Sequence, residues 1–484
     1  MSKDAVGART KVAIAEQSAY ETAAASVITG IEITSESLVN DIGSFASGAL
    51  RADRAVHKRV RGHQSAGGDI NFELNAEGLM LFYKHGLGRG ISLPETDGGV
   101  RGQLSADTSA NQTSLVLVNV AGSATFVSKQ GGGREIVVVT YGTDSTADLN
   151  YQHVAYTVFN AATNTLTCST GLGALKKGDY VMLRDSTAYV GIYTHYVEAY
   201  KSLPVALTTE VYRDIAVFIY SGCKVNTLGM TFPNNGMLTG TVNLLSRKEW
   251  SGDWLSADTS AAQSTLTLED ASGFPASGTI SVGSEDDLAY SSKSGNILTL
   301  SVVPAEAHSQ YDPVWLSKPA GTYTYPMSVV DPFSSFEAAL YLDNASSEVL
   351  SANFSIANNL YADKFQLGSK FRVRAPEQAR AVTGTINVEF DDMTLYSKFV
   401  RGSSASLQIR CVKDIDEVVA GSEVYYQQHL IFGDVEFNGT TPVAGGPELI
   451  VHDLPFTALY DDTYNKPEVV MILVNSQATL NAAS

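Results

Sequence analysis

Residues 67–88 read GGDINFELNAEGLMLFYKHGLG and contain the two patterns that decide the fold around them. In residues 69–74 apolar and polar side chains alternate, which puts Ile70, Phe72 and Leu74 on one face of a strand. Asn71 and Glu73 fall on the other face. The alternation predicts a β-strand with one buried and one wet face, as is typical of antiparallel sheets.

The same stretch predicts a short helix directly after the strand. Asn75 is a favourable N-cap residue, and Glu77 falls in the first turn. The helix carries an apolar stripe of Leu79, Leu81, Phe82 and His85, and Gly86 and Gly88 end it. We expect this helix to cover one face of the sheet. A weaker helical pattern lies near residues 392–400, at Met393, Tyr396, Phe399 and Val400.

Two further segments repeat the strand alternation of residues 69–74. In residues 238–244 the apolar positions are Leu238, Val242 and Leu244, and the polar ones are Thr239, Thr241 and Asn243. In residues 385–390 the polar positions are Thr385, Asn387 and Glu389. The chain of 484 residues also contains 41 Gly and 23 Tyr, which favour turns and strands. The sequence therefore predicts a mainly β protein.

An internal repeat divides the chain. The heptapeptide LSADTSA occurs at residues 104–110 and again at 255–261. Weaker matches follow in the same order and end with GDYVML at 178–183 and YDPVWL at 311–316. We predict two similar small all-β modules, at residues 98–193 and 252–321, inserted into a larger domain. That domain is made of the remaining segments, 1–97, 194–251 and 322–484.

Charge is unevenly distributed along the chain. The net charge is −18, and an acidic protein repels phosphate at long range. Residues 411–484 contribute −9, whereas residues 51–63 are basic. Contact between these two segments of neighbouring copies is one interpretation, and a solvated acidic surface is the other. The candidate residues for such a contact are Arg51, Arg54, Lys58, Arg59, Arg61, Asp414, Asp416 and Glu417.

The sequence offers no pattern of an enzyme or of a metal site. The three cysteines are far apart, no signal peptide or membrane span is predicted, and no known catalytic motif occurs. The acids at 285–287 and 391–392 lack the spacing of a calcium loop, so we expect no metal and no cofactor. Trp250, Trp254 and Trp315 bracket the second module. We interpret them as anchors of the module, with sugar stacking as the alternative.

Three stretches resemble the tail tube proteins of long-tailed bacteriophages. They are residues 67–88, residues 221–249 (SGCKVNTLGMTFPNNGMLTGTVNLLSRKE) and residues 350–400, which contain LSANFSIANNLYADKF and VTGTINVEF. The resemblance implies a β-sandwich with a flanking short helix, whose subunits form hexameric rings and pool strands into one barrel around a lumen. It implies a non-enzymatic virion protein of the phage tail, assembled in the bacterial cytoplasm. The implied partners are further copies of the chain, a tape measure protein and DNA in passage, without a membrane.

A lumen through which DNA moves is expected to be polar or acidic, because inward Lys or Arg would retain DNA. The candidates for lumen residues are Asn71, Glu73, Thr385, Asn387 and Glu389. The inserted modules are expected to decorate the outside of the tube, which favours a non-contractile tail. Two other functions stay open: a multi-module surface or decoration protein that recognises host glycans, and a glycosidase with two facing carboxylates.

Overall fold

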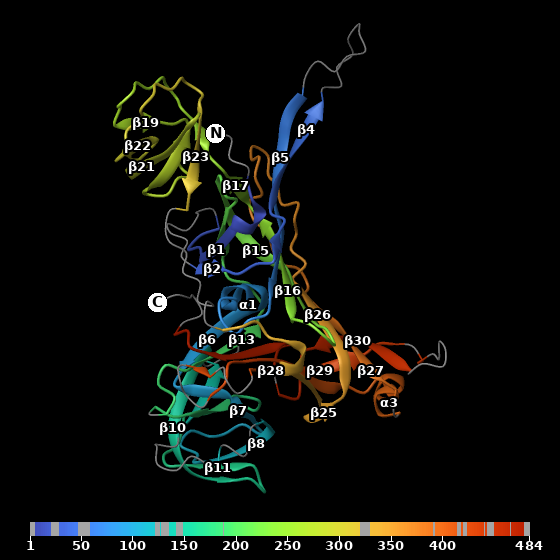
Figure 1. Cartoon of the computed structure of the whole chain (residues 1–484). Helices are drawn as coiled ribbons and strands as arrows, with labels where there is room; N and C mark the ends of the chain where they lie inside the picture. Colours follow the sequence, from blue (N-terminus) through green and yellow to red (C-terminus); the bar gives the residue numbers. More distant parts are fainter. Residues whose placement is uncertain are drawn as a thin grey trace.

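A computed structural model describes residues 5–20, 29–46, 59–121, 126, 135–141, 149–186, 188–319, 330–390, 393–413, 418–419, 424–439, 441–442, 450–464 and 466–478. The chain is mainly β, as predicted. A large sheet forms the middle of the molecule, a closed six-stranded barrel lies at one end and a separate six-stranded sheet near the other (Figure 1). Two strands of the large sheet extend away from the body as a hairpin arm (Figure 1).

The large sheet holds nineteen of the described strands and collects all three segments outside the repeat. Its strands are β1 (Lys11–Glu16), β2 (Thr29–Ile31), β3 (Ser35–Glu36), β4 (Val39–Ala46), β5 (Arg59–Glu73), β6 (Gly88–Pro94), β13 (Tyr193–Ala199), β14 (Leu207–Tyr212), β15 (Val217–Phe232), β16 (Thr239–Ser246), β17 (Lys248–Trp250), β24 (Ala338–Leu342), β25 (Ala345–Ser347), β26 (Val349–Ala357), β27 (Ala381–Glu389), β28 (Ala405–Val412), β29 (Gln427–Phe437), β30 (Val451–Leu459) and β31 (Val470–Asn475).

The two repeated segments form separate sheets with the same strand order. The barrel consists of β7 (Thr96–Leu104), β8 (Ser114–Ala121), β9 (Glu135–Tyr141), β10 (Leu149–Asn160), β11 (Thr165–Cys168) and β12 (Tyr180–Arg184). The second sheet, called the small sheet below, consists of β18 (Asp253–Trp254), β19 (Thr265–Thr267), β20 (Gly278–Val282), β21 (Glu285–Ser294), β22 (Ile297–Leu300) and β23 (Pro313–Lys318). In the barrel the order is β7-β12-β9-β10-β11-β8, and in the small sheet it is β18-β23-β20-β21-β22-β19.

The helix after β5 forms, but it begins later than the sequence predicted. Helix α1 spans Met80–Leu87, and its N-cap is Leu79. The prediction that Asn75 caps the helix is wrong, because Asn75 is fully buried and its Nδ2 donates to the Val330 carbonyl at 2.9 Å. Gly78 at φ 80° turns the backbone out of the helical region, so the helix starts only after it.

The second predicted helix is α3 (Thr394–Arg401), and it ends at Gly402 in the left-handed conformation. Two short 3₁₀ helices lie at Gly7–Arg9 and Ser335–Glu337. In the described residues no helix is long and apolar enough to cross a membrane. All three cysteines are unpaired and buried, and burial raises the pKa of the Cys168 thiol to about 11.

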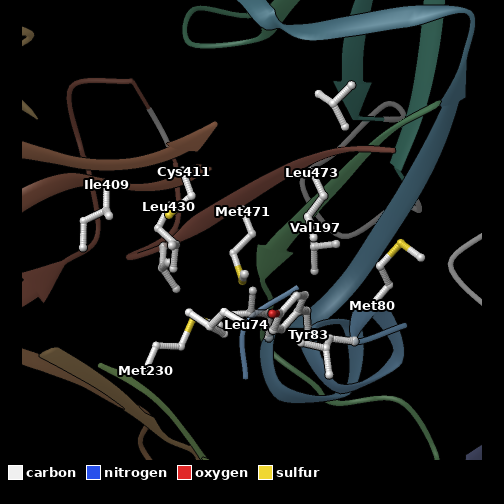
Figure 2. Packing of buried hydrophobic residues seen from close by; sticks show 14 of the residues in the cluster. Leu74, Met80, Tyr83, Val197, Met230, Ile409, Cys411, Leu430, Met471 and Leu473 are labelled. Atoms are coloured by element: carbon white, nitrogen blue, oxygen red, sulfur yellow. The ribbon is translucent and has the colours of Figure 1, made fainter. Parts of the chain in front are cut away.

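Helix α1 packs against β15, β13 and β6 of the large sheet, as expected for a helix that covers a sheet face. Figure 2 shows Tyr83 of α1 beside Leu74 at the end of β5, with Met471 and Leu473 of β31 above them. The Tyr83 hydroxyl donates to Gln428 Oε1 at 3.4 Å. Burial of each large apolar side chain here contributes roughly 1.5–3 kcal/mol, so α1 and the strands around it form one core.

Candidate functional site

One face of the large sheet is polar across seven neighbouring strands. The strands pair in the order β5-β16-β15-β26-β27-β30-β29, and every pair is antiparallel. The register aligns their outward residues into rows that cross the sheet. One row runs through Asn71, Thr241, Gly229, Ser355, Thr383, Thr457 and Glu436. The next row runs through Glu73, Thr239, Thr231, Asn353, Thr385 and Pro455.

The opposite face of the same strands is the hydrophobic core. Between the two polar rows lies a row of Phe72, Gly240, Met230, Phe354, Gly384 and Phe456, in which every residue except the half-buried Gly384 is buried. An added Cβ at Gly240 would come within 2.4 Å of the Phe72 ring, and one at Gly384 within 2.5 Å of the Phe456 ring. The two glycines therefore make room for aromatic rings under the sheet. The alternation fixes which side of each strand meets water.

The polar face, defined by these outward residues and their neighbours on the same strands, is acidic. Its carboxylates include Asp69, Glu73, Glu389, Glu436 and Asp453, and no Lys or Arg lies in the described rows from Asp69 to Glu436. Most of its other side chains are Thr, Ser and Asn. An uncharged hydroxyl and amide surface with scattered carboxylates attracts neither phosphate nor apolar groups.

Hydrogen bonds between neighbouring strands hold these side chains in place. Thr241 Oγ1 donates to Asn71 Oδ1 at 2.7 Å, and Asn243 Nδ2 donates to Asp69 Oδ1 at 2.6 Å. On the other side of the face, Asn387 Nδ2 donates to Asp453 Oδ1 at 2.5 Å. Ordered polar pairs on a wet face replace the apolar cross-strand contacts that hold a buried face.

The polar face is concave. A hollow open to solvent lies over its middle strands and is lined by Thr231, Thr239, Thr241, Asn353, Thr383 and Thr385. A sheet that curves around its own hydrophobic core has an apolar concave face. Here the concave face is polar, so the sheet curves around solvent. The hollow side of this sheet is its polar side, and the hydrophobic core lies on the other side.

All five predicted lumen candidates lie on this face. Asn71 and Glu73 are on β5, and Thr385, Asn387 and Glu389 are on β27, four strands away. Sequence reasoning missed the outward residues Asn353, Ser355, Glu436 and Asp453 between and beyond them. The same alternation was available in residues 351–356, where Ala352, Phe354 and Ile356 are buried.

The basic segment lies partly on the hairpin arm formed by β4 and β5. Arg59 and Arg61 are exposed on β5, and so are the apolar side chains of Val39, Phe45 and Val60 on the two strands. In the described residues β4 pairs only with β5, so its other edge is unpaired. The remaining candidates for a contact between copies lie outside the described residues: Arg51, Arg54, Lys58, Asp414, Asp416 and Glu417.

The other candidate sites have ordinary structural partners. Among the described residues no group of three metal-ligating side chains forms, and Asp391 and Asp392 lie outside them. Glu285 Oε2 is 3.1 Å from His308 Nε2, and Glu285 Oε1 accepts from the Ala305 backbone N–H at 2.7 Å. Burial opposes ionisation, but these bonds hold the Glu285 pKa below its usual value.

A buried polar joint between the barrel and the large sheet has no counterpart in the sequence predictions. Arg101 of β7 is 2% exposed, and it donates to the Gly98 carbonyl at 3.0 Å and to Gln408 Oε1 at 3.3 Å. Burial lowers its pKa to about 10. Single polar residues in separate strands carry no local pattern, so only the tertiary structure reveals that they meet.

Comparison with known proteins adds a family to this geometry. A family model described as phage tail tube protein matches residues 7–458. The match therefore includes the polar face, the arm and both repeated segments. No curated protein sequence matches the chain.

Proposed function

Since the chain belongs to the phage tail tube protein family, we propose that it polymerises into stacked hexameric rings and that its polar face lines the lumen of the resulting tube. The observation that carries the proposal is the concave, acidic face across seven strands. As a family member the chain is a structural component of the virion tail that assembles with further copies of itself. The conduit for DNA, the lumen residues and the ring size are the proposed parts.

The chemistry of the face suits passage of DNA. These five carboxylates on each copy amount to on the order of thirty per hexameric ring, where salt screens their charge over a Debye length of about 8–10 Å. DNA inside such a ring meets like charge and neutral hydroxyl groups on every side. DNA that passes such a wall forms no ion pairs and releases no counterions, so counterion release contributes no free energy of binding to the wall.

The arm is the proposed contact between copies. The unpaired edge of β4 offers backbone groups to a strand of a neighbour, and a closed cylinder shared by several copies removes such edges. We propose that Arg51, Arg54 and Lys58 of the basic segment meet the acidic segment 411–484 of a copy in the next ring, so that salt weakens stacking. The repeated segments are proposed to project outside, where they do not block the lumen. A tape measure protein occupies the lumen before DNA, and assembly takes place in the bacterial cytoplasm.

Electron microscopy of the purified chain tests the assembly, since tubes with a central channel are expected and dispersed particles contradict it. The lumen is tested in phage carrying Thr241→Lys and Asn387→Lys, two sites on the polar face. The matched control is Thr157→Lys, exposed on the barrel. DNA ejection is expected to be slower from the phage with the two lumen substitutions than from the wild type or the control phage. Equal ejection rates from these three phages contradict the lumen assignment. A glycan-binding protein instead stays dispersed and binds polysaccharide, and the exposed Trp254 is the feature that keeps this second candidate open.

A further inference from the structure

The repeated segments allow the barrel and the small sheet to be compared residue by residue. Gly178 N donates to the Leu104 carbonyl at 2.9 Å, and at the equivalent place Tyr311 N donates to the Leu255 carbonyl at 2.9 Å. Both residues are left-handed, Gly178 at φ 85° and Tyr311 at φ 70°. Gln103 pairs with Tyr180 in the barrel as Trp254 pairs with Pro313 in the small sheet. The outer face of β7 and β12 therefore corresponds to the outer face of β18 and β23.

In the barrel this face is covered by the large sheet. Gln103 is 5%, Tyr180 4% and Met182 0% exposed, and the Tyr180 ring lies 5.5 Å from that of Tyr196 on β13. Gly178 touches the turn after β30 so closely that an added Cβ would come within 2.0 Å of the Tyr464 carbonyl oxygen. The face and the turn beside it are thus the docking surface of the barrel, and glycine is needed where the backbones meet.

In the small sheet the equivalent face is aromatic and more exposed, although Trp315 is half-buried. Trp254 is 51% exposed and pairs with Pro313, which is also exposed. Trp315 follows on the same face, and Tyr311 in the adjoining turn is 60% exposed. The small sheet is attached to the large sheet elsewhere, through Trp250 and Phe274, whose rings are 4.3 Å apart. The cluster that joins the small sheet to the large sheet contains Val314 and Leu316 of β23, which alternate with the residues of the aromatic face.

Tyr311 occupies a conformation that a tyrosine adopts at a cost. The left-handed region is unfavourable for a residue with a Cβ and is common only for Gly, Asn and Asp. The sister position is glycine, so the turn itself does not require a side chain there. An exposed aromatic in a strained conformation adds nothing to the fold around it, which indicates that its side chain serves a contact.

We propose that the outer face of β18 and β23, with Tyr311, docks onto the arm of a second copy of this chain. The proposal rests on the assembly proposed above and names one of its contacts. Charge complementarity selects the arm. Residues 252–321 hold nine acids and two lysines, for a net charge of −7, and Asp258 accepts from the backbone N–H of Gln310, the residue before Tyr311. On the stem of the arm, Arg59 and Arg61 are exposed on one face of β5, and Phe45 and Val60, which pair with each other, are exposed on the other face.

The same chain thus presents an acidic aromatic face and an arm with a basic face. Both project toward the same end of the molecule and on opposite sides of it (Figure 1). Copies placed side by side bring the arm of one to the small sheet of the next, a heterologous contact that closes into a ring when the rotation permits. Trp and Tyr at the centre, Arg opposite them and charges at the rim are the composition of protein interface hot spots.

The test replaces the face by the residues of its sister. Trp254→Gln with Tyr311→Gly installs the side chains found at Gln103 and Gly178, so the small sheet is expected to fold, with a melting temperature equal to or above that of the wild type. The control is Ile297→Thr, a half-exposed residue on β22 whose sister is Thr165. We measure the critical concentration for assembly by sedimentation and inspect the pellets by electron microscopy. We expect at least a tenfold rise for the double variant and for Arg59→Glu with Arg61→Glu, and none for the control.

Each other outcome overturns the proposal in a distinct way. A wild-type chain that stays monomeric at every concentration overturns the assembly and this contact together. Wild-type tubes whose critical concentration the double variant leaves unchanged overturn the contact alone. Loss of binding to host-cell polysaccharide, with assembly unchanged, identifies the face as a glycan site instead. If Trp254→Gln with Tyr311→Gly weakens assembly but Arg59→Glu with Arg61→Glu leaves the critical concentration unchanged, the aromatic face binds something other than the arm.

Discussion

His195 is expected to make the folded chain lose stability in mild acid. It lies on β13, where that strand pairs with β6 and β31, and it is 0% exposed. Its Nε2 lies 2.9 Å from Asn475 Oδ1, and its Nδ1 lies 2.9 Å from Ser92 Oγ. A neutral ring satisfies both contacts, donating through Nε2 and accepting at Nδ1. Burial lowers the pKa of His195 from 6.5 to about 4, because a charged ring there loses its hydration.

The magnitude follows from the two pKa values. Since the folded pKa lies below the unfolded one, the contribution of His195 is complete above pH 6.5 and is lost as pH falls toward 4. Linkage gives a loss of about 2 kcal/mol at pH 5 and about 3 kcal/mol at pH 4. The cause is that the unfolded chain takes up a proton that the folded chain excludes.

The assay is denaturant unfolding of the monomer at pH 7.5 and pH 5, followed by fluorescence, for the wild type and His195→Gln. Glutamine does not titrate, so the variant is expected to lose about 2 kcal/mol less than the wild type between the two pH values. Burial also lowers the pKa of His85 and of His429, and comparison with the variant removes their contributions. His153→Gln, exposed on β10, is the control and is expected to behave like the wild type. An equal loss in His195→Gln and the wild type refutes the reasoning.

Three further predictions concern single contacts. Glu16 is half-buried, and its bonds to His85 at 3.0 Å and Lys84 at 2.7 Å outweigh burial and lower its pKa to about 2. The wild type is therefore expected to lose up to about 3 kcal/mol of folding stability as the pH falls from 4.5 to 2. Acid titrations of Glu16→Gln are expected to lack this loss. Trp250→Ala removes the ring that packs on Phe274 and is expected to cost about 3–5 kcal/mol, with faster proteolysis of residues 252–321, whereas Trp254→Ala leaves proteolysis unchanged. Gly178→Ala places a Cβ against Tyr464 at a residue with φ 85°, and it is expected to destabilise the chain by more than about 2 kcal/mol in thermal unfolding. The control is Gly295→Ala, at φ 57°, where an added Cβ has no atom within 4 Å. It is expected to cost only about 1 kcal/mol. Equal costs for the two glycines contradict the close approach.

The sequence determined which side of three strands meets water. The period of two in residues 69–74, 238–244 and 385–390 placed Phe72, Val242 and Ile386 inside, and all three are buried. The pattern depends only on neighbouring residues of one strand, so it can be read without knowing which strands pair. Helical periodicity predicted α1 and α3. The predicted start of α1 was wrong, because this periodicity does not record the rotation at Gly78 or the long-range bond of Asn75 to Val330.

Only the tertiary structure decided which strands lie side by side. The row from Glu73 to Thr385 crosses five strands whose residues are up to about three hundred positions apart, and alternation within one strand cannot set the register between two. The same holds for the two repeated segments. Their sequences established that they are sisters, but the burial of Tyr180 and the exposure of Trp254 depend on what each face meets after folding. Contacts between distant segments are fixed by the fold as a whole, so no local pattern records them.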